Sequence, residues 1–266
     1  MRPSSKSGPK SPDRGKAASR NYLEVTSLSA IEHMVEHCPE RIQRLIIFGS
    51  GPRTNPRVDR IQQTARAAKV AVDLAPPGDR GIDPVKAYVA PFEYAELAEW
   101  LETLGARPRA LVLALDHLQD PQNFGALCRT AEALGIAGIL LPKDRSVTVG
   151  PGVYSASVGA VETVPIVMVN NLGDGLRKLK DAGFWIVGTC LGAGATPPAE
   201  IPDFEKVVLV LGAELEGLSP SLEKVCDWRT EIPLQGKVQS LNVSVAGAIL
   251  MWELSRKAMD KRPSID

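Results

Sequence analysis

Residues 110–131 read ALVLALDHLQDPQNFGALCRTA, and the pattern changes in the middle of this stretch. The first six residues are continuously apolar, which predicts a buried β-strand. From Asp120 onward the apolar residues recur at helical spacing, and Asp120-Pro121 is typical of an N-cap followed by a first-turn proline. The stretch therefore predicts a strand, a polar loop and a helix whose buried stripe contains Phe124, Leu127, Cys128 and Ala131.

The same alternation continues towards the C-terminus. Strand-like apolar runs occur at 137–141, 184–188 and 207–211, with helical segments between them. Continuous apolar strands that alternate with helices predict an α/β fold with a parallel sheet covered on both faces. Ligand sites in such sheets lie beyond the carboxyl ends of the strands, so we expect the chemistry in the loops that follow these runs.

The N-terminal half predicts a smaller α/β unit. Residues 45–48 and 70–74 are strand-like, Asn55-Pro56 is a helix start, and the run from Phe92 to Leu104 has helical spacing. Residues 105–108 (GARP) are typical of a connection between domains. We therefore expect a tail at 1–20, a small domain at 21–104 and a second domain at 105–266.

Charge is unevenly distributed along the chain. Lys and Arg number 31, as do Asp and Glu, so the formal net charge is zero. Residues 1–20 contain six Lys and Arg against Asp13 alone, a net of +5, which leaves −5 for the remainder. Ser, Pro and Gly are also dense there, so we expect a disordered basic tail. It is either an RNA contact or a solubilising terminus.

Several functional classes are disfavoured by what the sequence lacks. No apolar run is long enough to span a bilayer and no secretory signal opens the chain, so we expect a cytoplasmic protein with no membrane contact. The four cysteines form no CxxC pair, which argues against a disulfide framework or a bound metal. Gly192-Ala193-Gly194 resembles the start of a dinucleotide-binding turn, but Pro197 stands where the third glycine belongs. Neither GxxxxGK[ST] nor GxSxG is present, which disfavours an NTPase or a serine hydrolase.

Three segments place polar residues at strand-to-helix transitions. The first carries Asn123 and Arg129, the second is LGAELEGLS at 211–219, and the third is IPLQGKVQSLNVSVA at 232–246. Taken singly, they are compatible with a surface arginine, a solvated turn and a helix with surplus capping residues. In the third segment, Ser240, Asn242 and Ser244 are expected in the first turn of a helix, where they would offer a hydrogen-bonding site.

In this order, the three segments resemble the signature motifs of the SpoU family within the SPOUT superfamily of RNA methyltransferases. The matching patterns are DPxNxGxxxR, GxExxG and IPLxGxxxSLNVS, and the resemblance covers about residues 110–258. Residues 142–146 and 159–162 are similar to the branch that methylates a guanosine of 23S rRNA. Residues 21–104 are more weakly similar to the substrate-binding domain of that branch.

The resemblance implies S-adenosylmethionine as the cofactor, a deep trefoil knot, a homodimer, and methylation of a ribose 2′-hydroxyl in RNA. It places Thr189, Leu211, Gly212, Ile232 and Leu241 at the cofactor. It places Asn123, Arg129, Glu214, Ser240 and Asn242 at the catalytic centre. We expect Arg129 to donate hydrogen bonds to the nascent alkoxide or a phosphate, because a guanidinium rarely loses its proton. A tRNA ribose methyltransferase and a non-catalytic rRNA-binding or assembly protein are the alternatives.

Overall fold

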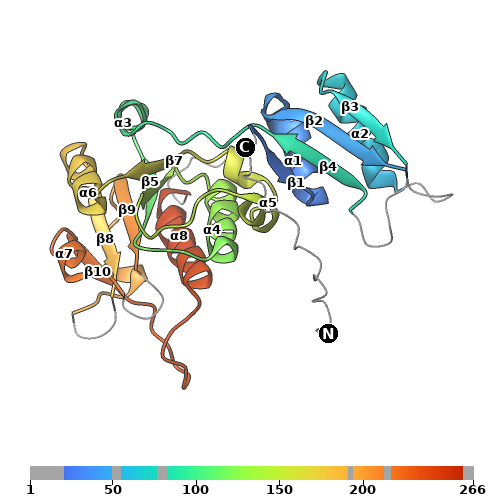
Figure 1. The fold of residues 1–266 in the computed structure, drawn as a ribbon. Helices are drawn as coiled ribbons and strands as arrows, with labels where there is room; N and C mark the ends of the chain where they lie inside the picture. Colours follow the sequence, from blue (N-terminus) through green and yellow to red (C-terminus); the bar gives the residue numbers. More distant parts are fainter. Residues whose placement is uncertain (1–20, 50–54, 77–82, 191–193, 213–216, 260–266) are drawn as a thin grey trace, which may run out of the picture.

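Two β-sheets, one in each half of the chain, organise the computed structural model (Figure 1). The structure describes residues 21–49, 55–76, 83–190, 194–212 and 217–259. The basic tail at 1–20 and Glu214 lie outside the described residues. Within those ranges no helix is long and apolar enough to cross a membrane, and no group of His, Cys, Asp and Glu side chains is arranged to hold a metal ion.

The first sheet has four strands in the order β1-β4-β2-β3, of which only β2 and β3 are parallel. Helix α2 begins where the sequence predicts, because the Asn55 side chain accepts a hydrogen bond from the Arg57 amide. The strands β1 and β4 were not anticipated. The elements are β1 (Leu23–Val25), α1 (Leu28–His37), η1 (Pro39–Arg41), β2 (Ile42–Phe48), α2 (Pro56–Ala67), β3 (Val72–Ala75) and β4 (Val85–Val89).

The second sheet has six strands in the order β10-β8-β9-β5-β6-β7, and every pair in it is parallel. The prediction of a parallel α/β sheet is therefore confirmed. The four strands expected from apolar runs are present, with β7 and β10 in addition. The strands are β5 (Ala110–Leu115), β6 (Ile139–Pro142), β7 (Ile166–Val169), β8 (Trp185–Thr189), β9 (Lys206–Leu211) and β10 (Trp228–Thr230).

Helices cover both faces of this sheet (Figure 1). Alternate residues of β5 enter different cores: Leu113 and Leu115 belong to one, Val112 and Ala114 to the other. The first core includes residues of α4 (Pro121–Ala133), α5 (Pro151–Ala156), η2 (Ala160–Glu162) and α8 (Val243–Met259). The second includes residues of α3 (Leu97–Gly105), α6 (Leu172–Asp181) and α7 (Pro220–Glu223). The short helix η3 (Pro198–Glu200) contacts α8.

The β5–α4 transition has the structure that its sequence predicts. Asp120 caps α4 by accepting hydrogen bonds from the amides of Gln122 at 3.2 Å and Asn123 at 3.1 Å. All four residues of the predicted stripe are buried. Gly125 permits a close helix contact, since a Cβ there would lie 2.4 Å from the Cβ of Ala156 in α5.

Helix α3 belongs with the second sheet, although the sequence placed it before a boundary at 104/105. It begins at Leu97 rather than Phe92, and its Trp100 indole donates a hydrogen bond to the carbonyl of Ala137 at 3.1 Å. Trp100 and Leu104 are buried in the core of the second unit. We therefore propose that the boundary lies in the connecting segment 90–96.

The polar residues of the third motif do not all lie in a helical turn. Helix α8 begins at Val243, so Ser240 lies before it in the irregular segment 231–242. The Asn242 Oδ1 atom accepts hydrogen bonds from the amides of Ser244 at 2.9 Å and Val245 at 3.4 Å. Asn242 thus caps the helix, and the expectation that Ser240 shares its first turn is wrong.

Candidate active site

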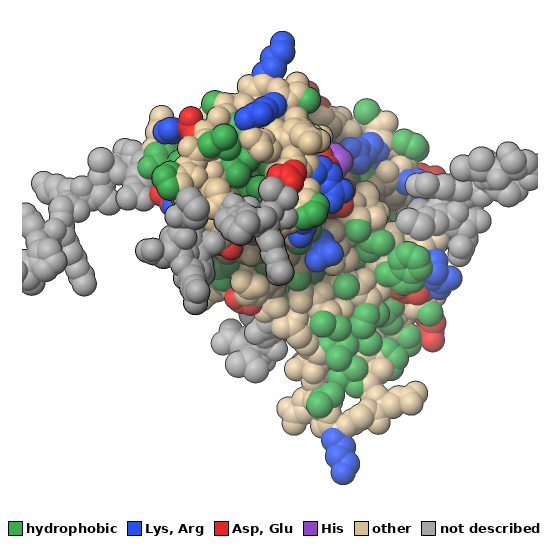
Figure 2. Space-filling model, turned by 90° about the vertical axis from the view of Figure 1, so that its right-hand side faces the viewer, with side chains coloured by type: hydrophobic (Ala, Val, Ile, Leu, Met, Phe, Trp, Pro, Cys, Tyr) green, Lys and Arg blue, Asp and Glu red, His purple; other side chains and the backbone are tan. Residues whose placement is uncertain are grey.

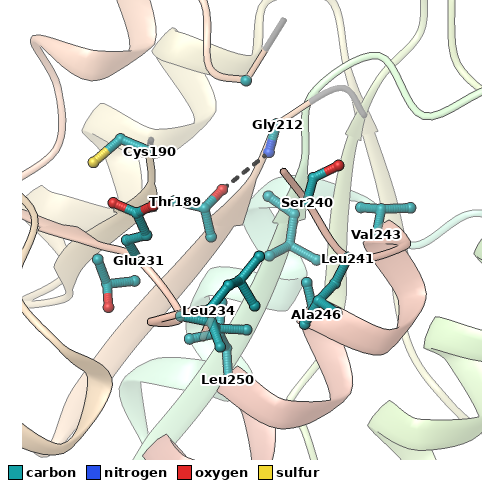
Figure 3. A pocket seen from close by; sticks show the side chains of 14 residues that line it. Thr189, Cys190, Gly212, Glu231, Leu234, Ser240, Leu241, Val243, Ala246 and Leu250 are labelled. Carbon is teal, nitrogen blue, oxygen red and sulfur yellow. Dashed lines mark hydrogen bonds between the residues drawn. The ribbon is translucent and has the colours of Figure 1, made fainter. Parts of the chain in front are cut away.

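A pocket opens at the carboxyl ends of three neighbouring strands of the second sheet (Figure 3). Thr189, Leu211 and Thr230 are the last residues of β8, β9 and β10, and all three line it. Its empty volume, the open mouth included, is about 730 Å³. The position is the one expected for a ligand in an α/β sheet.

Thr189 and Gly212 join the ends of two strands at one wall of the pocket. The Thr189 hydroxyl donates to the carbonyl of Val210 at 3.2 Å and accepts from the Gly212 amide at 3.3 Å. A Cβ at position 212 would lie 2.2 Å from the carbonyl carbon of Gly217. Glycine is therefore required so that the chain after β9 can pass close to itself, and the resulting wall is mostly backbone.

The opposite wall is apolar and comes from the irregular segment 231–242 and helix α8. Figure 3 shows Leu234, Leu241 and Leu250 gathered on this side of the pocket. Ile232 is half-buried and lines the same cavity. The five residues that the sequence assigned to a cofactor are thus brought together in one pocket. They are Thr189, Leu211, Gly212, Ile232 and Leu241.

The polar residues predicted to be catalytic lie around the pocket in different places. Ser240 lines it directly. Asn123 and Asn242 do not, but the amide nitrogen of Asn242 donates to Asn123 Oδ1 at 2.9 Å. This bond joins the first turn of α4 to the cap of α8, so it connects the first motif with the third.

Arg129 lies farther along α4, outside the pocket lining. It is six residues beyond Asn123, which corresponds to roughly 9 Å along a helix axis. Its side chain is exposed, and within the described ranges no carboxylate pairs with it. The guanidinium is therefore accessible to an anionic partner that arrives from solvent.

The structure adds Glu231, Cys190 and Asp116 to the site, none of which sequence reasoning selected. Glu231 and Cys190 line the pocket directly, next to Ile232 and Thr189 respectively. Burial raises the pKa of the Cys190 thiol, against the opposing effect of Arg229, so the thiol is protonated at neutral pH. Glu231 directly precedes the third motif and Cys190 directly follows a strand, and these positions could have identified both residues from the sequence.

Asp116 joins the end of β5 to the second motif. It directly follows β5 and is buried, and its Oδ2 atom accepts a hydrogen bond from the Ser219 amide at 3.4 Å. Its other oxygen lies 2.5 Å from Nδ1 of His117. A buried carboxylate that bonds a backbone amide 103 residues away fixes the end of the second motif relative to the first.

Comparison with known proteins gives a consistent assignment. Residues 110–252 match the sequence model of the SpoU rRNA Methylase family. A protein of Staphylococcus aureus (strain COL) named as a TrmH family tRNA/rRNA methyltransferase is 37% identical over 211 residues, which cover 77% of this chain and 85% of that protein.

Two solved structures share the fold over both units. The SpoU methyltransferase AviRb from Streptomyces viridochromogenes, in complex with AdoMet, superposes with a TM-score of 0.74 at 24% identity and covers 93% of this chain and 95% of its own. An RNA 2′-O ribose methyltransferase superposes with a TM-score of 0.71 at 24% identity, over 91% of this chain and 90% of its own.

Proposed function

Because the chain belongs to the SpoU rRNA methylase family, whose members are AdoMet-dependent RNA methyltransferases with a trefoil-knot fold, we propose that it methylates a ribose 2′-hydroxyl of RNA. The observation that carries the proposal is the pocket in which residues of the second and third motifs meet at the carboxyl edge of the sheet. The similar RNA 2′-O ribose methyltransferase supports the choice of the ribose oxygen.

The pocket suits S-adenosylmethionine. Its apolar wall offers a surface for the adenine ring, and the backbone-rich wall at Gly212 offers amides and carbonyls to the polar ends of the molecule. The cofactor supplies the methyl group on its sulfonium. What the chain must supply is alignment of the ribose and stabilisation of the charge that develops on its oxygen.

We assign that stabilisation to Arg129. A neutral hydroxyl is a poor nucleophile, and a guanidinium stays protonated, so Arg129 acts by donating hydrogen bonds to the ribose oxygen or to an adjacent phosphate. Its exposure on α4 leaves it open to an RNA backbone. The Asn123–Asn242 bond holds the starts of α4 and α8 together, and Ser240 offers a hydroxyl at the pocket wall. Glu214, in the second motif, is assigned a supporting role rather than that of a base.

We propose ribosomal RNA as the substrate, and a guanosine of 23S rRNA in particular. The description of the matching family model, which names rRNA, supports this choice. The alternative is transfer RNA, which the name of the Staphylococcus aureus relative also includes. Sequencing-based mapping of ribose methylation across total RNA, with and without the protein, tests both. A single new methylated guanosine in 23S rRNA is the expected result, a tRNA position supports the alternative, and no new methylation refutes the enzyme.

We propose further that the protein is a homodimer through one face of α8. Val245, Ile249 and Trp252 follow one another at helical spacing, and their exposed fractions are 49%, 42% and 52%. Figure 2 shows hydrophobic side chains gathered on the lower part of the molecule. Ala246 and Leu250, on the neighbouring side of the same helix, line the pocket, so a second copy on this face would lie next to the site.

The change Trp252→Glu should convert the dimer to a monomer, because a carboxylate cannot be desolvated in an apolar interface without a partner. Sedimentation velocity or light scattering measures the mass directly. Trp185→Glu is the matched control, since Trp185 is also a half-exposed tryptophan (46%) but lies at the start of β8. A wild-type monomer, or a dimer that survives Trp252→Glu and dissociates with Trp185→Glu, would contradict this interface.

A further inference from the structure

We propose that Glu162 is a positioning residue that fixes the N-terminal unit, residues 21–89, against the pocket-bearing unit. Bound RNA then reaches the pocket at one fixed distance and in one fixed orientation. The inference rests on the proposed function in one respect, namely that the N-terminal unit contacts the RNA. Four groups of contacts at the junction of the two units carry it.

The Glu162 carboxylate is the centre of the junction. Its side chain, in η2 of the second unit, is only 5% exposed. Oε2 accepts a hydrogen bond from Nε of Arg41 at 3.1 Å, and Oε1 accepts from the hydroxyl of Tyr154. Burial, followed by this bond, raises the pKa of Tyr154, so the tyrosine stays protonated and can donate. Both carboxylate oxygens are therefore engaged in a place that water reaches poorly.

Arg41 connects three parts of the chain. It lies in η1 of the first unit, and its Nη1 atom bonds Glu93 Oε1 at 2.9 Å in the connecting segment. Nη2 donates to the carbonyls of Pro91 at 2.5 Å and Ala90 at 3.3 Å. Burial alone would lower the pKa of the guanidinium, but Glu162 and Glu93 outweigh it and raise the pKa. The charge is therefore permanent, and removing Glu162 would leave it in the junction without its buried partner.

Shape complementarity adds a second constraint beside the ion pair. Gly159 has a φ of 88°, and a Cβ there would lie 2.9 Å from the carbonyl oxygen of Ala30 and 3.1 Å from Cδ2 of His33 in α1. The backbones of the two units thus approach as closely as glycine permits. One hydrophobic core runs through this contact and includes residues such as Ile31 of α1 and Val161 of η2.

The connecting segment is attached as well. The Val149 amide donates to the hydroxyl of Tyr94 at 3.0 Å, and the Ala95 amide donates to the carbonyl of Ile166 at 2.8 Å. Ala95 also forms a bridge with Val167 of β7. The segment is therefore part of the packed structure, whereas a flexible tether would let the N-terminal unit move independently.

The functional consequence follows from geometry. A reacting group that is displaced by about 1 Å can lose on the order of 100-fold in rate. If the N-terminal unit holds the RNA, the orientation of this unit relative to the pocket decides which ribose reaches the pocket. Loosening the junction should therefore lower the rate at the proper nucleotide and spread methylation to its neighbours, without changing cofactor binding.

The test compares the full-length wild type with Glu162→Gln, which keeps the size of the side chain and removes its charge. Asp174→Asn on the exposed face of α6 is the control, because it makes the same chemical change in an exposed pair with Arg177. We expect Glu162→Gln to lower kcat with RNA by about 10- to 100-fold. The Kd for S-adenosylmethionine should stay within twofold, and part of the methylation should move to adjacent nucleotides. A general loss of stability would lower activity without changing the distribution of methylated sites, so that distribution is the decisive measurement.

Calorimetry tests the junction without any need for activity. We expect one unfolding transition for the wild type and for Asp174→Asn, and two for Glu162→Gln, with the N-terminal unit melting first. Should Glu162→Gln not fold, Gly159→Ala separates the same surfaces sterically and should have the same effects. The proposal is overturned if the folded variants keep one transition and the wild-type kcat and site distribution. A wild type that methylates no RNA refutes the proposed function instead, and the number of transitions still decides whether the junction is fixed.

Discussion

The junction between the two units and the wall of the pocket are built in opposite ways. At the junction, the Glu162 carboxylate is almost inaccessible and both its oxygens are bonded. At the pocket, residues 233–240 are all exposed and belong to no helix or strand. The contrast indicates that the two regions have different roles. The junction fixes the distance between the two units before any ligand binds, while one wall of the pocket can adjust to the ligand. The predictions below test each side of this contrast.

The largest effect is expected at Arg129. Arg129→Ala should lower kcat by about 10²–10³, the usual loss when one aligned donor to a developing charge is removed. The melting temperature and the Kd for S-adenosylmethionine should hardly change, since the side chain is exposed and lies outside the pocket lining. Single-turnover methylation of RNA measures the rate, and Arg177→Ala on α6 is a control for an exposed helical arginine. Activity within a few-fold of wild type would remove Arg129 from the catalytic centre.

A smaller effect is expected for cofactor binding at the pocket. S-adenosylmethionine at a hundredfold excess over its Kd should stabilise the native protein by about 2.7 kcal/mol, measured as a rise in melting temperature without RNA. Gly212→Ala should abolish that rise, because its Cβ would collide with the carbonyl group of Gly217.

Gly236→Ala is the matched control for this experiment. Gly236 lies in the same irregular segment as Ile232 and Leu241, but a Cβ there would meet no atom within 4 Å. It should keep the full rise in melting temperature. If Gly212→Ala binds the cofactor normally, the backbone wall at Gly212 does not form the site. If neither the wild type nor Gly212→Ala binds the cofactor, the pocket has another ligand.

The parts of the molecule that could be predicted are those in which neighbouring residues decide the structure. The β5–α4 transition depends on a continuous apolar run, the Asp120 cap and helical spacing, all within 22 residues. Thr189, Leu211 and Gly212 line one pocket because they end or directly follow parallel strands, whose carboxyl ends lie at one edge of the sheet, whereas Arg129 lies outside that pocket. Strand β10 was missed because Trp228–Thr230 is short and has no apolar run.

Contacts between distant residues could not be predicted in this way. Arg41 and Glu162 are 121 residues apart, and neither has a local pattern that distinguishes it from a surface charge. The Asp116 bond to Ser219 is of the same kind. The displacement of Ser240 from the helix has a local cause that was misjudged, since the Asn242 side chain caps α8 and Ser240 lies before that cap, at the pocket.

The smallest effect is expected at His33, which tests the junction through pH. The imidazole lies in α1 beside Gly159, and its Nε2 atom is buried and has no hydrogen-bond partner among the described residues. Burial lowers the pKa of His33, as does His37, whose ring centroid is 4.6 Å away, against the opposing effects of Glu132 and Glu36. Because the pKa is lower in the folded protein, the unfolded chain binds the proton more readily.

Stability should therefore be constant above the ordinary pKa of about 6.5 and decline as the pH falls below it. Urea unfolding at pH 7.5 and 5.5 measures the decline, and His33→Gln should reduce it because an amide does not titrate. If the free energy of unfolding of the wild type and of His33→Gln depends on pH in the same way, the junction does not oppose the protonation of His33. The junction would then be more accessible to water than its contacts indicate.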